Sequence, residues 1–181
     1  TLSSGTLAIT DSGSLTVAGP VVAPTVSLIA GTLAITGFLN GVTTLALGVT
    51  AGGITETGSI AAGTLVSIGT IPAGTTLSGT NTINAIGDLN FTGTLILKDT
   101  VGPTITGIVG NATTLIASAT DLAIGAPSMT IASGGVLNVG SIVVTATNGG
   151  VIETGTGQII TQSLNIATSG AGDVSLTNKN N

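Results

Sequence analysis

Short bursts in which apolar and small polar residues alternate recur along the whole chain. Thr6–Thr10 and Asp173–Thr177 are two examples, and each puts Leu, Ile or Val on one face and Thr, Ser or Ala on the other. Strict alternation of this kind predicts a half-buried β-strand. Roughly 20 such bursts occur, about every 8 to 10 residues, with Gly, Asn, Ser or Pro between them. Helical spacing is sustained nowhere, so we expect an all-β protein.

Internal repetition favours one all-β architecture over the others. Gly5–Asp11 resembles Gly93–Asp99, 88 residues later, and Gly53–Gly58 resembles Gly150–Gly155 at an offset of 97. We therefore expect two tandem units of about 90 residues, approximately 1–84 and 85–181, within one domain. A smaller period of about 20 residues per two or three strands lies inside each unit. Such nesting is typical of a solenoid, in which each coil stacks on the one before.

The sequence thus predicts a single right-handed parallel β-helix (β-solenoid) of about 8–10 coils. Its length would be roughly 40–50 Å, from the inter-strand spacing of about 4.8 Å. Aliphatic residues should stack in ladders inside it, with Leu7, Ile54, Leu95 and Val151 pointing inward. The two aromatic residues, Phe38 and Phe91, are expected in the core or packed against an end.

Composition excludes several classes of function. Charged residues are 5% of the chain, against about 25% in typical globular proteins. With two Lys and no Arg, we expect no nucleic-acid partner. With no His or Cys, we expect no zinc or haem site, and we predict no metal and no cofactor. No apolar run reaches the 18 or so residues of a membrane helix, so we expect no membrane insertion.

The carboxylates are the candidate site residues. Glu56 and Glu153 occupy equivalent places in the two repeats, so a solenoid should hold them far apart rather than pair them at one hydrolytic cleft. We expect each to be a carboxylate at a turn or strand edge that keeps the surface hydrated. For the aspartates we expect turn roles through bonds from side chain to backbone, rather than calcium binding; these are Asp11, Asp88, Asp99, Asp121 and Asp173.

Other motifs have simple structural interpretations. The Gly48–Gly53 string lacks the lysine of a phosphate-binding loop and is expected to form a solenoid corner. The sequons Asn90–Thr92 and Asn111–Thr113 are weak glycosylation signals. Thr-x-Thr pairs can bind ice when they recur at the same place in every coil. Three such pairs occur here: Thr55/Thr57, Thr104/Thr106 and Thr154/Thr156. We do not expect them to recur in every coil, and the preference of β-branched residues for strands accounts for them without ice binding.

An enzyme of the polysaccharide-degrading β-helix type would need acids and bases clustered in one groove. Lys98 and Lys179 are the only cations besides the amino terminus, and the seven carboxylates are scattered. We therefore predict that the chain is not an enzyme, with no catalytic residues.

Four strings resemble repeats of filamentous-haemagglutinin-like bacterial exoproteins: Leu15–Val21, Gly52–Ile60, Leu77–Ile83 and Gly172–Asn178. The resemblance covers nearly the whole chain. It implies a right-handed parallel β-helix, export across the outer membrane through a partner pore, and a role as adhesin, biofilm scaffold or surface fibre. The part present here resembles the repetitive shaft of such a protein.

Together these observations predict a structural segment of an extracellular bacterial fibre, sheath or adhesin shaft at the cell surface. The alternative is a carbohydrate-binding or ice-binding solenoid, which a regular Thr or Asn ladder on one face would favour. The terminal segments, Thr1–Ser4 and Asn178–Asn181, are short for caps. We therefore expect end-to-end stacking on further repeats or on identical copies, with a host or cell-surface glycan as another possible partner.

Overall fold

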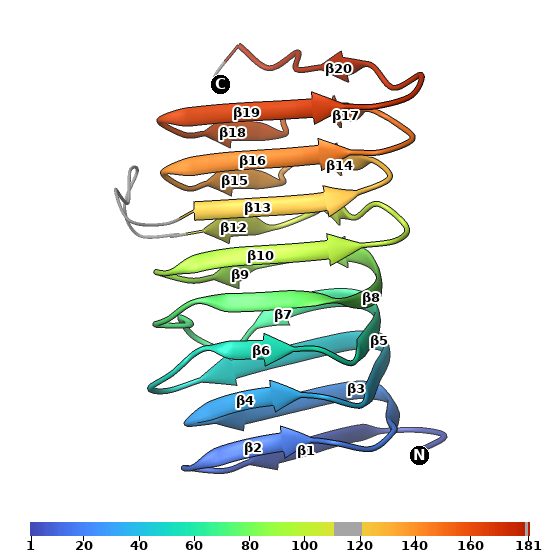
Figure 1. Cartoon of the computed structure of the whole chain (residues 1–181), viewed down its shortest axis with the longest axis vertical. Helices are drawn as coiled ribbons and strands as arrows, with labels where there is room; N and C mark the ends of the chain where they lie inside the picture. The colour runs from blue at the N-terminus through green and yellow to red at the C-terminus, as the bar shows by residue number, and fades with distance from the viewer. Residues whose placement is uncertain (111–120, 180) are drawn as a thin grey trace.

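The computed structural model of the chain is a tall stack of β-strand coils with the two termini at opposite ends (Figure 1). It describes residues 1–110, 121–179 and 181, and no helix occurs among them. In the described part of the chain, twenty strands pair in parallel to form about eight coils. In Figure 1 the front strands run to the right and the rear strands to the left as the chain rises, so the β-solenoid winds in a right-handed sense. The predicted fold is therefore confirmed.

Two faces of the solenoid form one continuous sheet of sixteen strands, because β8 contributes to both. We call them face one and face two. Face one contains β1 (Thr6–Thr10), β3 (Val21–Ala30), β5 (Phe38–Val49), β7 (Ser59–Ser67), the end of β8 (Thr75–Ile86), β11 (Thr104–Ile105), β14 (Met129–Ile131), β17 (Val151–Glu153) and β20 (Val174–Ser175).

Face two contains the start of β8 and seven further strands. They are β2 (Ser14–Val17), β4 (Thr32–Ile35), β6 (Ile54–Glu56), β10 (Thr94–Asp99), β13 (Asp121–Ala126), β16 (Ser141–Ala146) and β19 (Ser163–Thr168). A third face appears in the later coils as a separate sheet of four short strands. These are β9 (Leu89–Asn90), β12 (Ile108–Gly110), β15 (Val136–Asn138) and β18 (Gln158–Ile160).

The coil is the structural repeat. Ser14 pairs with Thr32, 18 positions later, and Val151 pairs with Val174, 23 positions later. The spacing between paired residues rises to 26–28 across residues 111–120. The earlier coils have longer strands, and in β3 and β5 a register shift marks a bulge that bends the strand.

The core is a set of aliphatic columns that run along the axis, because the side-chain period of two keeps each column on the inner face. One column on face two contains Leu15, Leu33, Ile54, Thr75, Leu95, Leu122 and Ile142. Its neighbour contains Val17, Ile35, Glu56, Leu77, Leu97, Ile124 and Val144. The structure buries Ile54, Leu95 and Val151 and packs Leu7 against the core, so all four predicted inward residues are confirmed.

Phe91 is buried, as predicted, but the prediction for Phe38 is wrong. Phe38 begins β5 opposite Ser59 and keeps 38% of its surface exposed. The alternation of side chains along β5 explains the difference. Leu39, the next residue, is fully buried, so Phe38 faces outward.

The two sequence repeats do not match whole numbers of coils. Leu7 lies on face one, whereas its counterpart Leu95 lies on face two. Glu56 lies on face two, and its counterpart Glu153 lies on face one. The matched strings therefore share strand and turn chemistry rather than a common place in the coil.

Candidate functional surfaces

Three polar side chains lie in the interior where the chain passes from face two to face one. They are Glu56, Asn81 and Asp99, with exposed fractions of 1%, 0% and 4%, and we call this group the polar corner. They come from successive coils, and Asn81 pairs with Asp99 in the ladder between β8 and β10. Buried polar groups need hydrogen-bond partners, so the contacts of these three residues define what the corner does.

Asn81 connects three coils. Its Oδ1 accepts a hydrogen bond from the Ile60 backbone N–H at 2.8 Å. Its Nδ2 donates to Oε2 of Glu56 at 3.0 Å, to the Lys98 carbonyl at 3.1 Å and to the Leu77 carbonyl at 3.3 Å. A single amide therefore binds backbone or side chain in the coil below, in its own coil and in the coil above.

Glu56 is not the surface carboxylate that the sequence analysis predicted, and that prediction is wrong. It stands in an inner column between Ile35 and Leu77, so its side chain points into the solenoid. Its Oε2 accepts hydrogen bonds from the Gly79 backbone N–H at 2.9 Å and from Asn81. Its Oε1 is buried without a hydrogen-bond partner among the described residues.

Asp99 confirms the predicted turn role and extends it. Its Oδ1 accepts from the backbone N–H groups of Val101 at 2.8 Å and Gly102 at 3.0 Å, which closes its own turn. Its Oδ2 accepts from the Ile83 backbone N–H at 2.7 Å in the preceding coil. The carboxylate thus acts as an acceptor for three N–H groups at the corner.

Glu153 forms a second buried polar group near the last coil, so its predicted surface position is also wrong. It is 3% exposed and follows Ile131 in an inner column of face one. Its Oε2 accepts from the Asn178 backbone N–H at 2.6 Å and from Nδ2 of Asn181 at 3.1 Å. Oε1 has no partner in the described part of the chain. Burial separates both glutamates from any substrate in solution.

The other aspartates differ from one another. Asp11 accepts from the Gly13 backbone N–H at 2.9 Å and confirms its predicted turn role. Asp88 accepts instead from the Ile108 N–H of the next coil at 2.9 Å. Asp173 is exposed, and its backbone carbonyl accepts from Val151. The side chain of Asp121 lies outside what the structure describes. Within the described residues, no group of three or more acidic, His or Cys side chains is arranged to hold a metal ion.

The sequon at Asn90 is engaged in the fold. Its Nδ2 donates to the Thr70 hydroxyl at 2.9 Å, and the hydroxyl of Thr92 donates to the Pro72 carbonyl at 3.1 Å. Phe91 between them is buried. The sequon Asn111–Thr113 lies outside the described residues.

Gly48–Gly53 forms the end of β5 and the corner before β6, as predicted.

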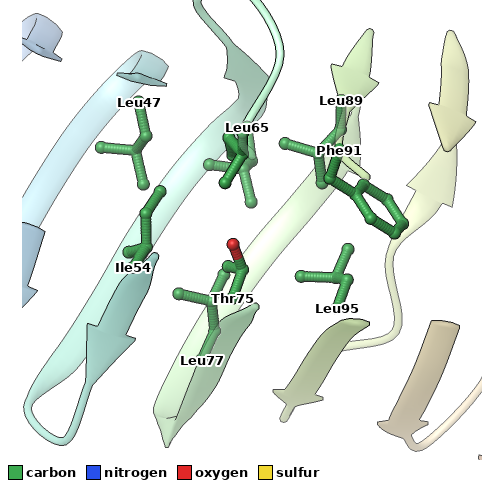
Figure 2. A pocket seen from close by; sticks show the side chains of 9 residues that line it. Leu47, Ile54, Leu65, Thr75, Leu77, Leu89, Phe91 and Leu95 are labelled. Carbon is green, nitrogen blue, oxygen red and sulfur yellow. The ribbon is translucent and has the colours of Figure 1, made fainter. Parts of the chain in front are cut away.

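A small void in the core adjoins the buried hydroxyl of Thr75. The void measures about 10 Å³ and is lined by aliphatic side chains, Phe91 and Thr75, as Figure 2 shows. Thr75 is 3% exposed, and its Oγ1 has no hydrogen-bond partner among the described residues. A buried water needs at least two polar partners, and Thr75 is the one polar residue among those that line this void, so the lining side chains offer a water no second partner.

The outer surface carries a regular feature that the sequence analysis missed. The three Thr-x-Thr pairs seen in the sequence do not align from coil to coil, as expected; Thr55, for example, has Ala34 and Thr76 as neighbours. On face one, however, Thr6 pairs with Thr25, Thr25 with Thr44, and Thr44 with Thr64. We call these four residues the threonine ladder. The recurrence is hidden in the sequence because each coil differs slightly in length.

Comparison with known proteins gives no relative. No family model, no curated protein and no solved structure matches the chain. Across the described residues, the structure holds no helix of the length and apolar character needed to cross a membrane.

Proposed function

We propose that this chain is a structural segment of an extracellular bacterial fibre, sheath or adhesin shaft. The observation that carries the proposal is the continuity of the inner columns, which run from the first coil to the last with parallel pairing between every neighbour. Each coil is bound to its neighbours by a whole ladder of hydrogen bonds, so such a stack provides length together with stiffness.

The outer surface of face two supports a shaft rather than a repeated binding site. Its central outward column changes chemistry from coil to coil: Thr16, Ala34, Thr55, Thr76, Ile96, Ala123, Val143 and Asn165. A ligand that spans several coils would meet a different group at each step. The polar corner also supports a structural role, because its buried groups bind the coils to one another and not to a partner.

The last coil has the features of a stacking surface. Leu164 and Val174 stand in inner columns above Ile142 and Val151, yet they are 40% and 46% exposed. A further coil laid on β19 and β20 would bury these side chains and pair the open strand edge, which otherwise invites association. We propose that this coil belongs to further repeats or to another copy of the chain.

A bacterial cell-surface location agrees with this role. With two Lys and no Arg in 181 residues, the chain offers few sites to trypsin-like proteases. Its resemblance to filamentous-haemagglutinin-like repeats points the same way. An adhesin shaft would carry a glycan-binding part elsewhere on its rod and would itself have no catalytic role.

Sedimentation velocity at micromolar concentration tests the proposal. We expect the chain to form axial oligomers that grow with concentration. Leu164→Lys should abolish them, because an inward-pointing charge at an open edge opposes stacking. Ser163→Lys is the matched control, since Ser163 is exposed and faces outward from the same strand. A stable monomer for the unmodified chain, or equal effects of the two substitutions, would contradict the proposal.

A further inference from the structure

The threonine ladder occupies one line along the outside of face one. Thr6, Thr25, Thr44 and Thr64 lie side by side in four consecutive coils, each next to an inward residue of the core. Ala85 takes the next place, and Thr104 and Thr130 continue the line. Parallel pairing sets the distance between neighbouring threonines at about 4.7–4.9 Å.

The hydroxyls of the ladder are free to bind something outside the chain. Within the described residues, the side chains of Thr25, Thr44 and Thr64 make no hydrogen bond. Threonine is also stiff at χ1, since two heavy atoms branch from its Cβ. The array of hydroxyl and methyl groups is therefore ordered before any ligand arrives, and this lowers the entropy lost on binding.

The surroundings of the ladder are uncharged, and a hollow lined by residues such as Asn40, Gly63 and Thr82 adjoins its Thr64 end. The outward residues two places further along these strands are Ala8, Ser27, Ala46 and Val66, and the first three are small. The strands β1, β3, β5 and β7 contain no charged residue. Their one aromatic residue, Phe38, begins β5 away from the ladder.

These properties select among occupants. An ionic ligand would need opposite charges, and a sugar polymer would be expected to stack on aromatic rings; neither feature is present along the ladder. A protein partner would have to desolvate the hydroxyls, which is unfavourable unless each finds a new bond. An ordered lattice of water satisfies every hydroxyl and also surrounds the methyl groups.

From this geometry we infer that face one of the first four coils is an ice-binding surface. The threonine hydroxyls join the lattice at the spacing of the coils, and the methyl groups and the small residues beside them keep the contact close. This activity goes beyond the proposed shaft, because stacking uses the ends of the solenoid and the ice contact uses its side.

Inhibition of ice recrystallisation by the whole chain tests the inference. We expect inhibition by the unmodified chain, and its loss in Thr25→Tyr and Thr44→Tyr, because a large ring would hold the ladder away from the ice. Thr55→Tyr is the matched control: Thr55 is exposed on face two and also faces outward. Thr44→Val separates hydroxyl from shape, and we expect it to weaken the inhibition without abolishing it. Circular dichroism checks that every variant keeps its β-structure.

Three results would overturn the inference. One is growth of unshaped ice crystals at the rate of buffer alone in the presence of the unmodified chain. Another is an equal loss of inhibition in Thr55→Tyr and Thr44→Tyr, which would show that ice binding does not depend on face one. The third is retention on insoluble neutral polysaccharide with no effect on ice, which would assign the ladder to a glycan. None of these depends on whether the chain stacks end to end.

Discussion

The carboxylate of Glu56 accepts a hydrogen bond of 3.0 Å from the side-chain amide of Asn81, and both residues are almost wholly buried. The pair lies in successive coils at the polar corner. Neither side chain reaches solvent, so the bond joins one coil to the next from inside the solenoid. The stability of the stack should therefore depend on a few buried polar groups as well as on its aliphatic columns.

Asn81→Ala tests this dependence. The substitution leaves the Ile60 N–H and the Lys98 carbonyl without their partners and removes one donor to Glu56. An orphaned buried group costs about 1–3 kcal/mol, so we expect a large fall in the free energy of unfolding. Asn84→Ala is the control, since Asn84 is exposed on the same strand. Urea titration followed by circular dichroism measures both, and equal midpoints would contradict the assigned role.

Asp99→Asn should destabilise the chain nearly as much as Asp99→Ala. Both carboxylate oxygens of Asp99 accept backbone N–H groups, so an amide would point its own N–H groups at a donor whichever way it turns. We expect a loss of about 1–3 kcal/mol. Asp11→Asn is the comparison, because among the described residues Asp11 accepts from Gly13 alone, which leaves its other oxygen free to become the amide nitrogen. Thermal melts measure the stability of both variants. An unchanged melting temperature for Asp99→Asn would exclude this arrangement of acceptors.

Thr75→Val should stabilise the chain. The Thr75 hydroxyl is buried among aliphatic side chains (Figure 2) and has no hydrogen-bond partner in the described part of the chain. Valine has nearly the same shape as threonine. Removing an unsatisfied buried hydroxyl is worth about 1–3 kcal/mol in protein mutational data. Thr76→Val, on the outward side of the same strand, controls for strand propensity. If the melting temperature falls in Thr75→Val alone, the hydroxyl must have a partner in solution.

Gly58→Ala should be strongly destabilising. A Cβ at Gly58 would overlap the Gly37 carbonyl of the preceding coil, and Gly79 stands in the same relation to Gly58. The corner therefore needs glycine in successive coils so that the backbones approach closely, and overpacking there should cost about 1–3 kcal/mol. Gly125→Ala is the matched control, because nothing lies within 4 Å of a Cβ at Gly125. Denaturant midpoints that shift equally would refute the close approach.

The sequence predicted the fold well because alternation and coil length are local properties. The alternation that predicts the strands of Leu95 and Ile54 also predicts that both side chains are buried, as they are. That pattern also placed Glu56 beside Ile54 and Glu153 beside Val151 on the inward side. The charge of a carboxylate favours the surface whereas the alternation favours the interior, and the prediction that follows charge is wrong for both glutamates. The partners that satisfy Glu56 come from the next coil, 23 and 25 positions away, and no local pattern shows them.

The threonine ladder illustrates the opposite difficulty. Its members are 19 or 20 positions apart, and the neighbouring coils vary further, so a search for a fixed Thr-x-Thr spacing overlooks them. Only the register of the pairing aligns them. The repeat offsets of 88 and 97 are not whole numbers of coils either, so the matched strings lie on different faces.

Electron cryomicroscopy of the chain at micromolar concentration tests most directly whether it is a stackable shaft. The account predicts rods whose length exceeds that of one segment, with a layer line near 4.7–4.9 Å along the rod axis that continues across the joints. Leu164→Lys should give single short segments under the same conditions. Isolated particles of one segment for the unmodified chain, or assemblies joined only side by side, would contradict it.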